Sequence, residues 1–200
     1  MKKTVATITL LAFLGCPSLI CAQETLGDRL HAYYDTVCKE RGWKELKVNV
    51  DGLERKLIWR APQGGWPKGA IIALHGGGGA CSNWGATIRL GRAKVAFTEQ
   101  AINRGFALFA LDSTDGLAKD AKGRSYGKRW ACTYDPKVKN IDLPFIDKVV
   151  DSVIPKLRPR KSSASIYMTG ISNGGFTTIL YATHYPQKIR AFAPVACGDP

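Results

Sequence analysis

The stretch that most constrains the fold is TGISNGG at residues 169–175, because it joins two segments of different periodicity. Residues 165–169 read as a short buried strand, and residues 175–185 read as a helix. Only residues 170–174 connect them, so the chain must turn sharply. Glycines at both ends of this connection leave room where the two backbones crowd together. The stretch therefore predicts a strand and a helix that pack directly against one another.

The rest of the chain alternates between the same two kinds of segment. Residues 47–50 and 55–59 flank Asp51-Gly52 and predict a hairpin. Short apolar runs predict further strands at 70–74, 106–111 and 190–197. Helical periodicity predicts helices at 24–41, 93–103 and 142–157. The last of these begins with Asp142 as N-cap and has Pro144 in its first turn. This order predicts an α/β fold with a mostly parallel sheet and an N-terminal antiparallel hairpin.

The turn at 170–174 fits the pattern G-x-S-x-G. In that pattern the serine stands on a strained strand-to-helix turn, with its hydroxyl above the sheet. The helix that follows directs its N–H groups and its positive dipole end toward the same point. We therefore predict Ser172 as a catalytic nucleophile and the Asn173 N–H as a donor to an oxyanion. The alternative, a plain Gly-Ser turn at a helix start, fits less well with the strand and helix predicted on either side.

A second glycine-rich stretch, His75–Gly79, directly follows the strand predicted at 70–74. Glycines let the backbone curl so that an N–H faces a cleft, and we predict Gly77, with Gly78 next, as the other oxyanion donor. A phosphate-binding loop is excluded because no Lys-Ser or Lys-Thr follows the glycines, and a dinucleotide loop because no acidic ribose partner lies at the expected position. His75 is expected to brace this loop rather than to act as a base.

These segments and their order resemble the α/β-hydrolases, and more narrowly the secreted polyhydroxybutyrate depolymerase and feruloyl-esterase-like group. The resemblance covers roughly residues 45–200 and is carried by IIALHGGGG, IDLPFIDKVVDSVI, IYMTGISNGG and IRAFAPVACG. It implies hydrolysis of carboxylic esters, small or polymer-linked, through an acyl-enzyme, with no metal or organic cofactor. It gives Ser172 the role of nucleophile and Gly77 and Asn173 the role of oxyanion donors.

The acid and base of a triad are not visible in this chain. In this fold the acid and then the histidine follow the serine. The only histidine after Ser172 is His184, about 18 Å away along the predicted helix. The only later carboxylate is Asp199, and His31 lies in the first predicted helix. We therefore expect an N-terminal part of a longer hydrolase, without the last strands of its sheet and inactive by itself. A non-catalytic binding module with the same fold is the alternative.

The first 22 residues read as a secretory signal peptide. Lys2 and Lys3 precede an apolar run at 5–14 that is too short to span a bilayer, and small residues follow it. The protein is therefore expected to be secreted or periplasmic, with a lipid anchor at Cys16 as a minor option. No transmembrane segment is predicted.

The chain is accordingly divided into three parts. A signal peptide occupies residues 1–22, an N-terminal helical segment residues 23–44, and an α/β-hydrolase domain residues 45–200. A chain of 200 residues is expected to hold a single such domain.

The chain is strongly basic, with 29 Lys and Arg against 16 Asp and Glu and a formal net charge of +13. Basic residues cluster at 119–129 and at 156–161. Such a charge favours anionic polymers or surfaces. No nucleic-acid-binding module is recognisable, however, so nucleic acid is not an expected partner and the clusters are interpreted as solvated faces.

Four cysteines follow the signal peptide: Cys38, Cys81, Cys132 and Cys197. In an oxidising compartment an even count permits two disulfides in three connectivities. A bridge between Cys81 and Cys132 is the preferred pair because both lie in long predicted loops, and buried free thiols are the alternative. No C-x-x-C or paired-histidine spacing is present, so no metal site is predicted.

Overall fold

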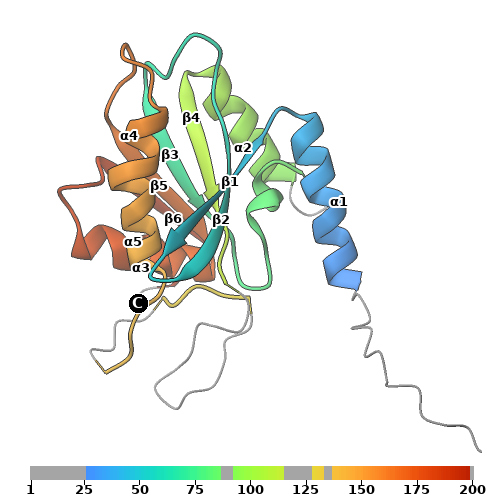
Figure 1. The fold of residues 1–200 in the computed structure, drawn as a ribbon, viewed down its shortest axis with the longest axis vertical. Coiled ribbons are helices and arrows are strands. Elements are labelled where there is room, and N and C mark those ends of the chain that lie inside the picture. The colour runs from blue at the N-terminus through green and yellow to red at the C-terminus, as the bar shows by residue number, and fades with distance from the viewer. Residues whose placement is uncertain (1–25, 87–91, 115–127, 133–136, 199–200) are drawn as a thin grey trace, which may run out of the picture.

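The computed structural model describes residues 26–86, 92–114, 128–132 and 137–198. Its centre is a six-stranded sheet in the order β1-β2-β4-β3-β5-β6. The strands are β1 (Lys44–Val50), β2 (Leu53–Arg60), β3 (Gly69–Leu74), β4 (Phe106–Leu111), β5 (Ile166–Ile171) and β6 (Ala191–Val195). Figure 1 shows helices on both faces of this sheet.

The sheet is antiparallel at one side and parallel elsewhere. β1 and β2 form a hairpin, and β2 pairs antiparallel with β4, whereas β4, β3, β5 and β6 are mutually parallel. Asp51 and Gly52, which join the hairpin, both have positive φ angles of 51° and 82°. Positive φ at both central residues is the geometry that two-residue hairpin turns require. The predicted α/β fold with an N-terminal antiparallel hairpin is confirmed.

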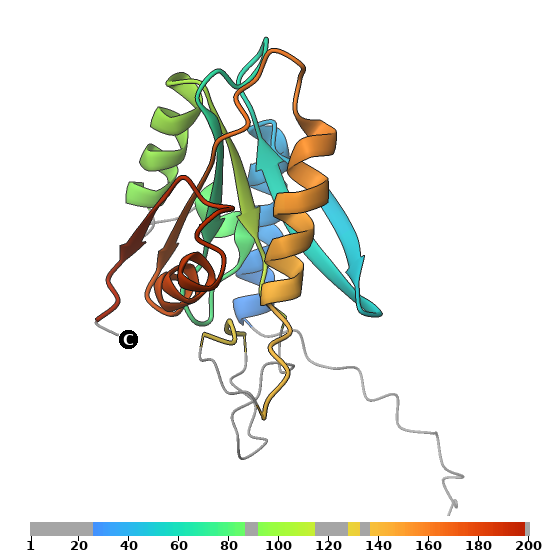
Figure 2. The ribbon, with the colours of Figure 1, turned by 90° about the vertical axis from the view of Figure 1, so that its left-hand side faces the viewer.

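Two layers of helices sandwich the sheet (Figure 2). One face carries α3 (Leu143–Lys148), a π-helical turn (Val149–Val153), α4 (Ile154–Leu157) and α5 (Asn173–His184). The other face carries α1 (Leu26–Glu40), a 3-10 turn (Cys81–Trp84) called η1 and α2 (Arg92–Asn103). Among the described residues, no helix is long and apolar enough to cross a membrane.

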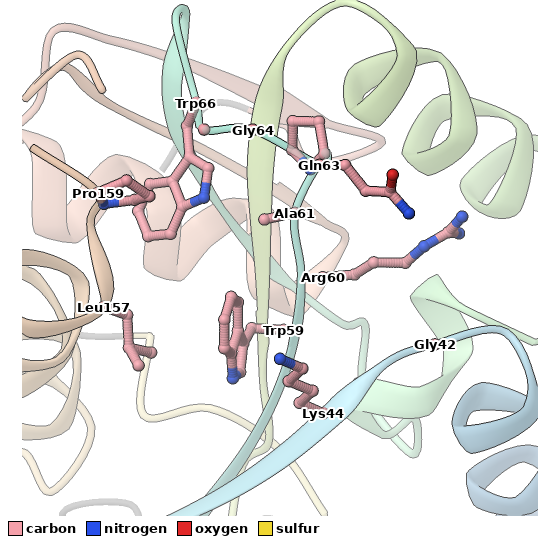
Figure 3. Close-up of a pocket in the computed structure, with 12 residues that line it drawn as sticks. Gly42, Lys44, Trp59, Arg60, Ala61, Gln63, Gly64, Trp66, Leu157 and Pro159 are labelled. Atoms are coloured by element: carbon pink, nitrogen blue, oxygen red, sulfur yellow. The ribbon is translucent and has the colours of Figure 1, made fainter. Parts of the chain in front are cut away.

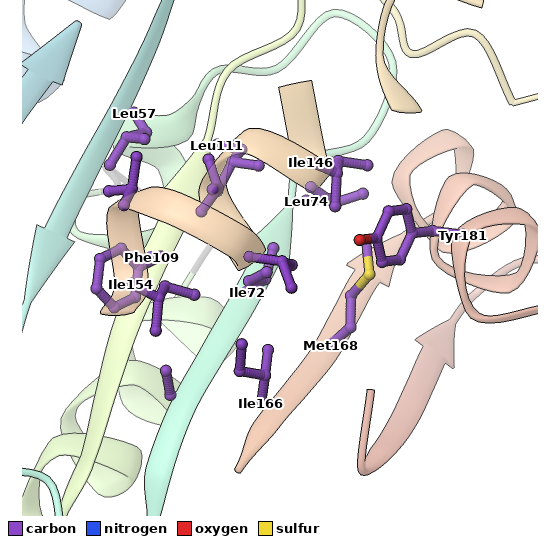
Figure 4. Close-up of a cluster of buried hydrophobic side chains, with 14 of the residues drawn as sticks. Leu57, Ile72, Leu74, Phe109, Leu111, Ile146, Ile154, Ile166, Met168 and Tyr181 are labelled. Carbon is purple, nitrogen blue, oxygen red and sulfur yellow. The ribbon is translucent and has the colours of Figure 1, made fainter. Parts of the chain in front are cut away.

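Each face buries its own hydrophobic cluster because alternate residues of a strand point to opposite sides. On β3, Ile72 and Leu74 pack under α3–α5, and Figure 4 shows them with Tyr181 of α5. Their neighbours Ile71 and Ala73 pack under α1 and α2. The continuous apolar run of β3 therefore reflects burial on both sides.

The helix predicted at 142–157 is present but is widened in the middle by a π-helical turn at Val149–Val153. Pro155 lies just after this turn and has no N–H to donate, so regular helical hydrogen bonding cannot continue through it. Asp142 occupies the N-cap position as predicted, but its side chain forms no capping hydrogen bond. The carboxylate of Asp142 is instead paired with a buried arginine, described below.

Strand β6 forms one edge of the sheet. All five of its residues are exposed, including Phe192 and Val195. Phe192 lies opposite Met168 of β5 on the α5 face, and Val195 lies opposite Ile171 on the α2 face. This edge is thus apolar on both faces and is not covered by any described part of the chain.

Candidate functional site

Ser172 lies on the sharp connection between β5 and α5. Its backbone angles are φ 52° and ψ −119°, a strained conformation for a residue with a side chain. The Ser172 N–H donates to the Val195 carbonyl of β6 at 2.8 Å, which fixes the turn to the neighbouring strand. The side chain is exposed at the carboxyl end of the parallel strands. This is the geometry predicted for a serine nucleophile.

Two glycines make this turn possible. A Cβ at Gly170 would overlap the carbonyl group of Gly174 and the hydroxyl of Thr178. A Cβ at Gly174 would overlap the carbonyl oxygens of Leu74 and His75, at the end of β3. Any larger residue would therefore force the turn away from both α5 and β3.

The glycine-rich loop after β3 lies beside Ser172. A Cβ built at Gly76 would be 3.6 Å from the Ser172 Cβ and 3.2 Å from the Ile171 carbonyl oxygen. Within the loop, the Gly78 N–H donates to the Lys128 carbonyl at 2.8 Å and the Gly79 N–H to the Gly76 carbonyl at 3.0 Å. The two glycine-rich stretches of the sequence thus meet at one point of the fold.

Two backbone N–H groups at this point have no hydrogen-bond acceptor within the described part of the chain. One belongs to Gly77, in the middle of the loop, and the other to Asn173, the first residue of α5. Gly78, the second choice from the sequence, already donates its N–H to Lys128. Two free N–H groups beside an exposed serine are what an oxyanion hole requires.

His75 is fully buried and engages both ring nitrogens. Nδ1 lies 2.7 Å from the Gly76 carbonyl oxygen, and Nε2 lies 3.1 Å from the Ser113 N–H and 3.2 Å from Asp112 Oδ1. Neither nitrogen is directed at Ser172. His75 fastens the glycine-rich loop to the end of β4, the bracing role expected from the sequence.

Asp112 anchors this buried cluster. Its carboxylate also accepts the Cys81 N–H at 3.3 Å and lies 3.4 Å from the Lys128 ammonium. Burial alone would raise the pKa of Asp112, but the contact with His75 and the charges of Lys128 and Lys56 outweigh it, and the pKa lies below its usual value. Asp112 is therefore ionised at neutral pH.

Residues 128–132, called the strap here, cross the carboxyl end of the sheet and connect the two glycine-rich stretches. The Asn173 side chain accepts the Trp130 N–H at 2.7 Å and donates to the Trp130 carbonyl at 3.1 Å. The buried indole N–H of Trp130 donates to the His75 carbonyl at 2.9 Å. Trp130 thus links the residue after the serine to the start of the glycine-rich loop.

A buried ion pair between Arg55 and Asp142 anchors the strap to the sheet. Arg55 and Asp142 are 1% and 0% exposed, and their side chains are 2.5 Å apart. The other Asp142 oxygen accepts the Ala131 N–H at 2.6 Å, and Arg55 also donates to the Ile141 and Asp112 carbonyls. The pair therefore ties the strap to β2 and to the end of β4.

Sequence reasoning missed the strap and its anchors. Trp130 and Asn173 are 43 residues apart, and Arg55 and Asp142 are 87 apart. No periodic or motif spacing connects such residues. The only signal was a tryptophan inside an otherwise polar and glycine-rich stretch, which is an unusual place for a fully buried side chain.

None of the three histidines is placed as a base for Ser172. His184 is the last residue of α5, so the whole helix separates it from the serine at the other end. His31 lies on α1, where burial and the charge of Lys128 lower its pKa. Asp199, the other residue considered after Ser172, lies outside the described residues, as does the predicted signal peptide with Cys16.

The predicted bridge between Cys81 and Cys132 is not present, and all four thiols are free. Cys81 is buried in the cluster under α1 and α2, whereas the Cys132 sulfur contacts the Asn173 amide at 3.2 Å. The two residues lie at one end of the sheet, but their side chains make different contacts. Burial raises the pKa of the Cys81 thiol well above its usual value, which suits an inert core residue.

The described residues contain no group of histidine, cysteine and carboxylate side chains that could hold a metal ion. The site therefore consists of a serine, backbone N–H groups and a buried polar support. Such a set can attack a carbonyl carbon and stabilise the resulting oxyanion, provided that a base removes the serine proton.

No family model matches the sequence, and no curated protein matches it either. Solved structures match its fold. Est1E from Butyrivibrio proteoclasticus is 23% identical with a TM-score of 0.50, and the match covers 76% of this chain and 51% of that one. The S-formylglutathione hydrolase FrmB from Staphylococcus aureus is 17% identical with a TM-score of 0.51, covering 78% and 57%. The 2,6-dihydroxy-pseudo-oxynicotine hydrolase is 20% identical with a TM-score of 0.56, covering 82% and 40%.

These similarities, together with the sheet order and the strained serine turn, show that the chain has the α/β-hydrolase fold. The chain spans about half the length of the structures it matches. At these identities the likeness establishes the fold and leaves the activity to be argued from the site.

Proposed function

We propose that the protein is a serine hydrolase that cleaves carboxylic esters through an acyl-enzyme on Ser172. The hydroxyl attacks the ester carbonyl, and the Gly77 and Asn173 N–H groups receive the oxyanion. The alcohol then leaves, and water releases the acid. No metal or organic cofactor takes part in these steps.

One observation carries this proposal. Ser172 has a positive φ and an exposed side chain at the start of α5, with two N–H groups beside it that have no acceptor among the described residues. Backbone strain of this kind is retained where the surrounding structure enforces it, commonly at functional sites. Gly170 and Gly174 enforce it here by admitting no side chain.

The cellular location, the narrower family relationship and the substrate class are inferred from the sequence. The charged and apolar start of the chain supports export to the periplasm or beyond, with residues 1–22 removed and the hydrolase domain beginning near residue 45. The order of segments supports a relationship to the polyhydroxybutyrate depolymerase and feruloyl-esterase-like group. We propose esters attached to polymers, either polysaccharides or polyesters, as the substrate class.

The 200 residues alone are expected to be a poor catalyst. Both nitrogens of His75 are engaged, and His184 lies at the far end of α5. Removing the base from a serine triad lowers kcat by roughly a millionfold. We propose that a base supplied from outside the described residues completes the site.

The test compares the 200-residue chain with the product of the reading frame where that frame continues past codon 200. The longer product should hydrolyse p-nitrophenyl acetate, lose this activity in Ser172→Ala and carry a fluorophosphonate on Ser172. The 200-residue chain should turn over poorly, but added imidazole should allow acetylation of Ser172, detected by peptide mass. Thr183→Ala, at an exposed position on the same helix, is the matched control.

Two results would remove the proposal. One is labelling of another residue, and the other is unchanged hydrolysis in Ser172→Ala. A protein that folds, carries no label and shows no turnover in either form would instead support the alternative, a binding module that has kept the fold.

A further inference from the structure

The end of the sheet opposite Ser172 carries an unbalanced positive charge. Parallel strands all begin at one edge, called the amino end here, and β1 begins and β2 ends at the same edge. Basic residues stand at or just before nearly every one of these strand ends. They form the basic rim: Lys44, Arg60, Lys68, Arg104, Arg158, Arg160, Lys161 and Arg190.

The basic rim is poorly neutralised. Among its members, only Arg60 forms an ion pair with a described carboxylate, that of Glu99 at 2.6 Å. Elsewhere in the described chain, several lysines do form ion pairs: Lys56 with Asp35, Lys128 with Asp112, and Lys188 with Asp147 and Asp151. Like charges left without partners at one edge repel each other and attract an anionic partner.

A cavity of about 560 Å³ opens within this basic rim. Figure 3 shows its wall, which includes Trp59, Trp66, Lys44, Gln63, Leu157 and Pro159. Cavities of this size accommodate small ligands or one or two units of a polymer. The wall combines aromatic surface, an ammonium group and an amide.

The aromatic part of the wall is held rigidly. The Trp59 ring stacks on Phe109 with centroids 5.8 Å apart and planes 8° from parallel, and Trp66 packs edge-on against both. The backbone of Trp66 is bonded to Ser162 and Ser163, which fastens the 61–66 loop to the segment before β5. A ligand would therefore meet a preformed surface and pay little to order it.

Lys44 determines the chemistry of the ligand. Its ammonium lies 5.1 Å from the centre of the Trp59 ring, on a side chain that is exposed and forms no ion pair with a described residue. A ligand at this point meets a cation and an indole together. The side of a sugar ring formed by C–H groups packs well on an indole, and a carboxylate on that sugar would pair with the ammonium.

We propose that the amino end binds an acidic polysaccharide, with one uronic acid residue in the cavity against Trp59 and its carboxylate on Lys44. Further acidic units lie along the basic rim toward Arg158 and Arg160. The site is independent of Ser172, which lies at the other end of the sheet. It would hold a polymer on the protein whether or not its esters are cleaved.

A nucleic acid fits this end less well. Single-stranded binding relies on bases stacked on open aromatic faces. The cavity offers at most one open indole face, because Phe109 covers the other face of Trp59 and Trp66 is only 2% exposed, so successive bases would have no run of aromatic faces to stack on. A phosphate backbone would contact the basic rim alone and would not need the cavity.

The test uses the full chain carrying Ser172→Ala, so that no ester is cleaved. Calorimetry compares tetragalacturonate with its fully methyl-esterified form in 50 mM NaCl. The acid should bind at least tenfold more tightly. Lys44→Gln should weaken binding of the acid about tenfold, since a charge-assisted contact is lost. Lys47→Gln, in the middle of the same strand and already paired with Glu54, is the matched control and should change binding less than twofold.

Three outcomes would overturn the proposal: no binding of the acid, equal binding of the methyl ester, or no effect of Lys44→Gln in a variant that unfolds like the parent. Tighter binding of a 12-base-pair DNA duplex, unaffected by Lys44→Gln, would assign the basic rim to nucleic acid instead. Arg160→Gln provides a second, exposed position, and it should weaken tetragalacturonate binding without loss of stability. Because Ser172→Ala is used throughout, failure here leaves the proposed hydrolase activity untouched.

Discussion

The two ends of the sheet are built in different ways. At the carboxyl end, backbone groups and buried side chains do the positioning: Ser172 has a positive φ, His75 is fully buried, and Trp130 connects them. At the amino end, exposed cations surround a cavity lined by indoles. Chemistry on a carbonyl requires fixed donors, whereas retention of a charged polymer requires only local charge and a surface. The carboxyl end should therefore tolerate substitution far less well than the amino end.

The largest difference in the free energy of unfolding is expected between alanine substitutions at two glycines, Gly170 and Gly64. Gly170→Ala would push a methyl group into the Gly174 carbonyl, which cannot move without displacing α5. We expect a loss of more than about 3 kcal/mol in the free energy of unfolding. Gly64→Ala, at the amino end, has a φ of +85° but no atom within 4 Å, so it should cost about 1 kcal/mol. Urea unfolding measures both, and equal costs would contradict the contrast.

The next contrast concerns two ion pairs. Asp142→Asn keeps the shape of the side chain but leaves Arg55 buried without its counter-charge. The expected loss is about 3 kcal/mol, because the stranded charge cannot reach water. Glu99→Gln removes the partner of Arg60, a pair whose side chains are 39% and 24% exposed, and should cost about 0.5 kcal/mol.

A second readout separates strap loosening from general destabilisation in these variants. Amide exchange at Ala131 should accelerate in Asp142→Asn at temperatures where the fold is intact, because a carboxamide has one acceptor oxygen, for which the Arg55 guanidinium and the Ala131 N–H then compete. It should not change in Glu99→Gln. Unchanged exchange in both variants would mean that the ion pair does not hold the strap.

The carboxyl end should also depend on acid pH. The pKa of Asp112 is lower in the folded chain than its ordinary value of 3.8, so ionised Asp112 stabilises the fold above that value. This contribution is lost as the pH falls from 3.8 through the lower folded pKa. Asp112→Asn should therefore be less stable than the parent at pH 7, by about 1 kcal/mol, and the difference should shrink below pH 3.8. A difference that stays constant down to pH 2.5 would exclude this linkage.

The contrast also explains what could be predicted from sequence. The turn at Ser172 and the glycine-rich loop at His75–Gly79 are contiguous stretches, and the structure brings them together. Strands β3 and β4 were predicted because residues buried on both faces form unbroken apolar runs. The Trp130 strap could not be predicted, because hydrogen bonds between residues 43 apart leave no periodic trace. The basic rim could not be predicted either, since the sheet order places its members together only after folding.

The π-helical turn and the predicted but absent disulfide illustrate two further limits of prediction from sequence. Helical periodicity at 142–157 is satisfied almost equally by an α-helix and by one with a single widened turn, so Pro155 gave the only local signal. The parity of the cysteine count favoured bridges, but Cys81 is buried in the core cluster under α1 and α2. Counting cysteines establishes which bridges are permitted and does not place their side chains.

The smallest expected changes in stability come from two lysine substitutions, one at each end of the sheet, and they have opposite signs. Arg160 and Lys161 are adjacent, exposed and without an ion pair to a described carboxylate, so Lys161→Gln relieves repulsion. It should raise stability by a few tenths of a kcal/mol in 20 mM NaCl and have no effect in 0.5 M NaCl, where exposed charges are screened. Lys128→Gln removes a cation that faces the buried Asp112 carboxylate, so it should lower stability by about 0.5 kcal/mol, and salt should suppress this less. The same sign and the same salt dependence for both lysines would mean that the two ends do not differ in how their charges are paired.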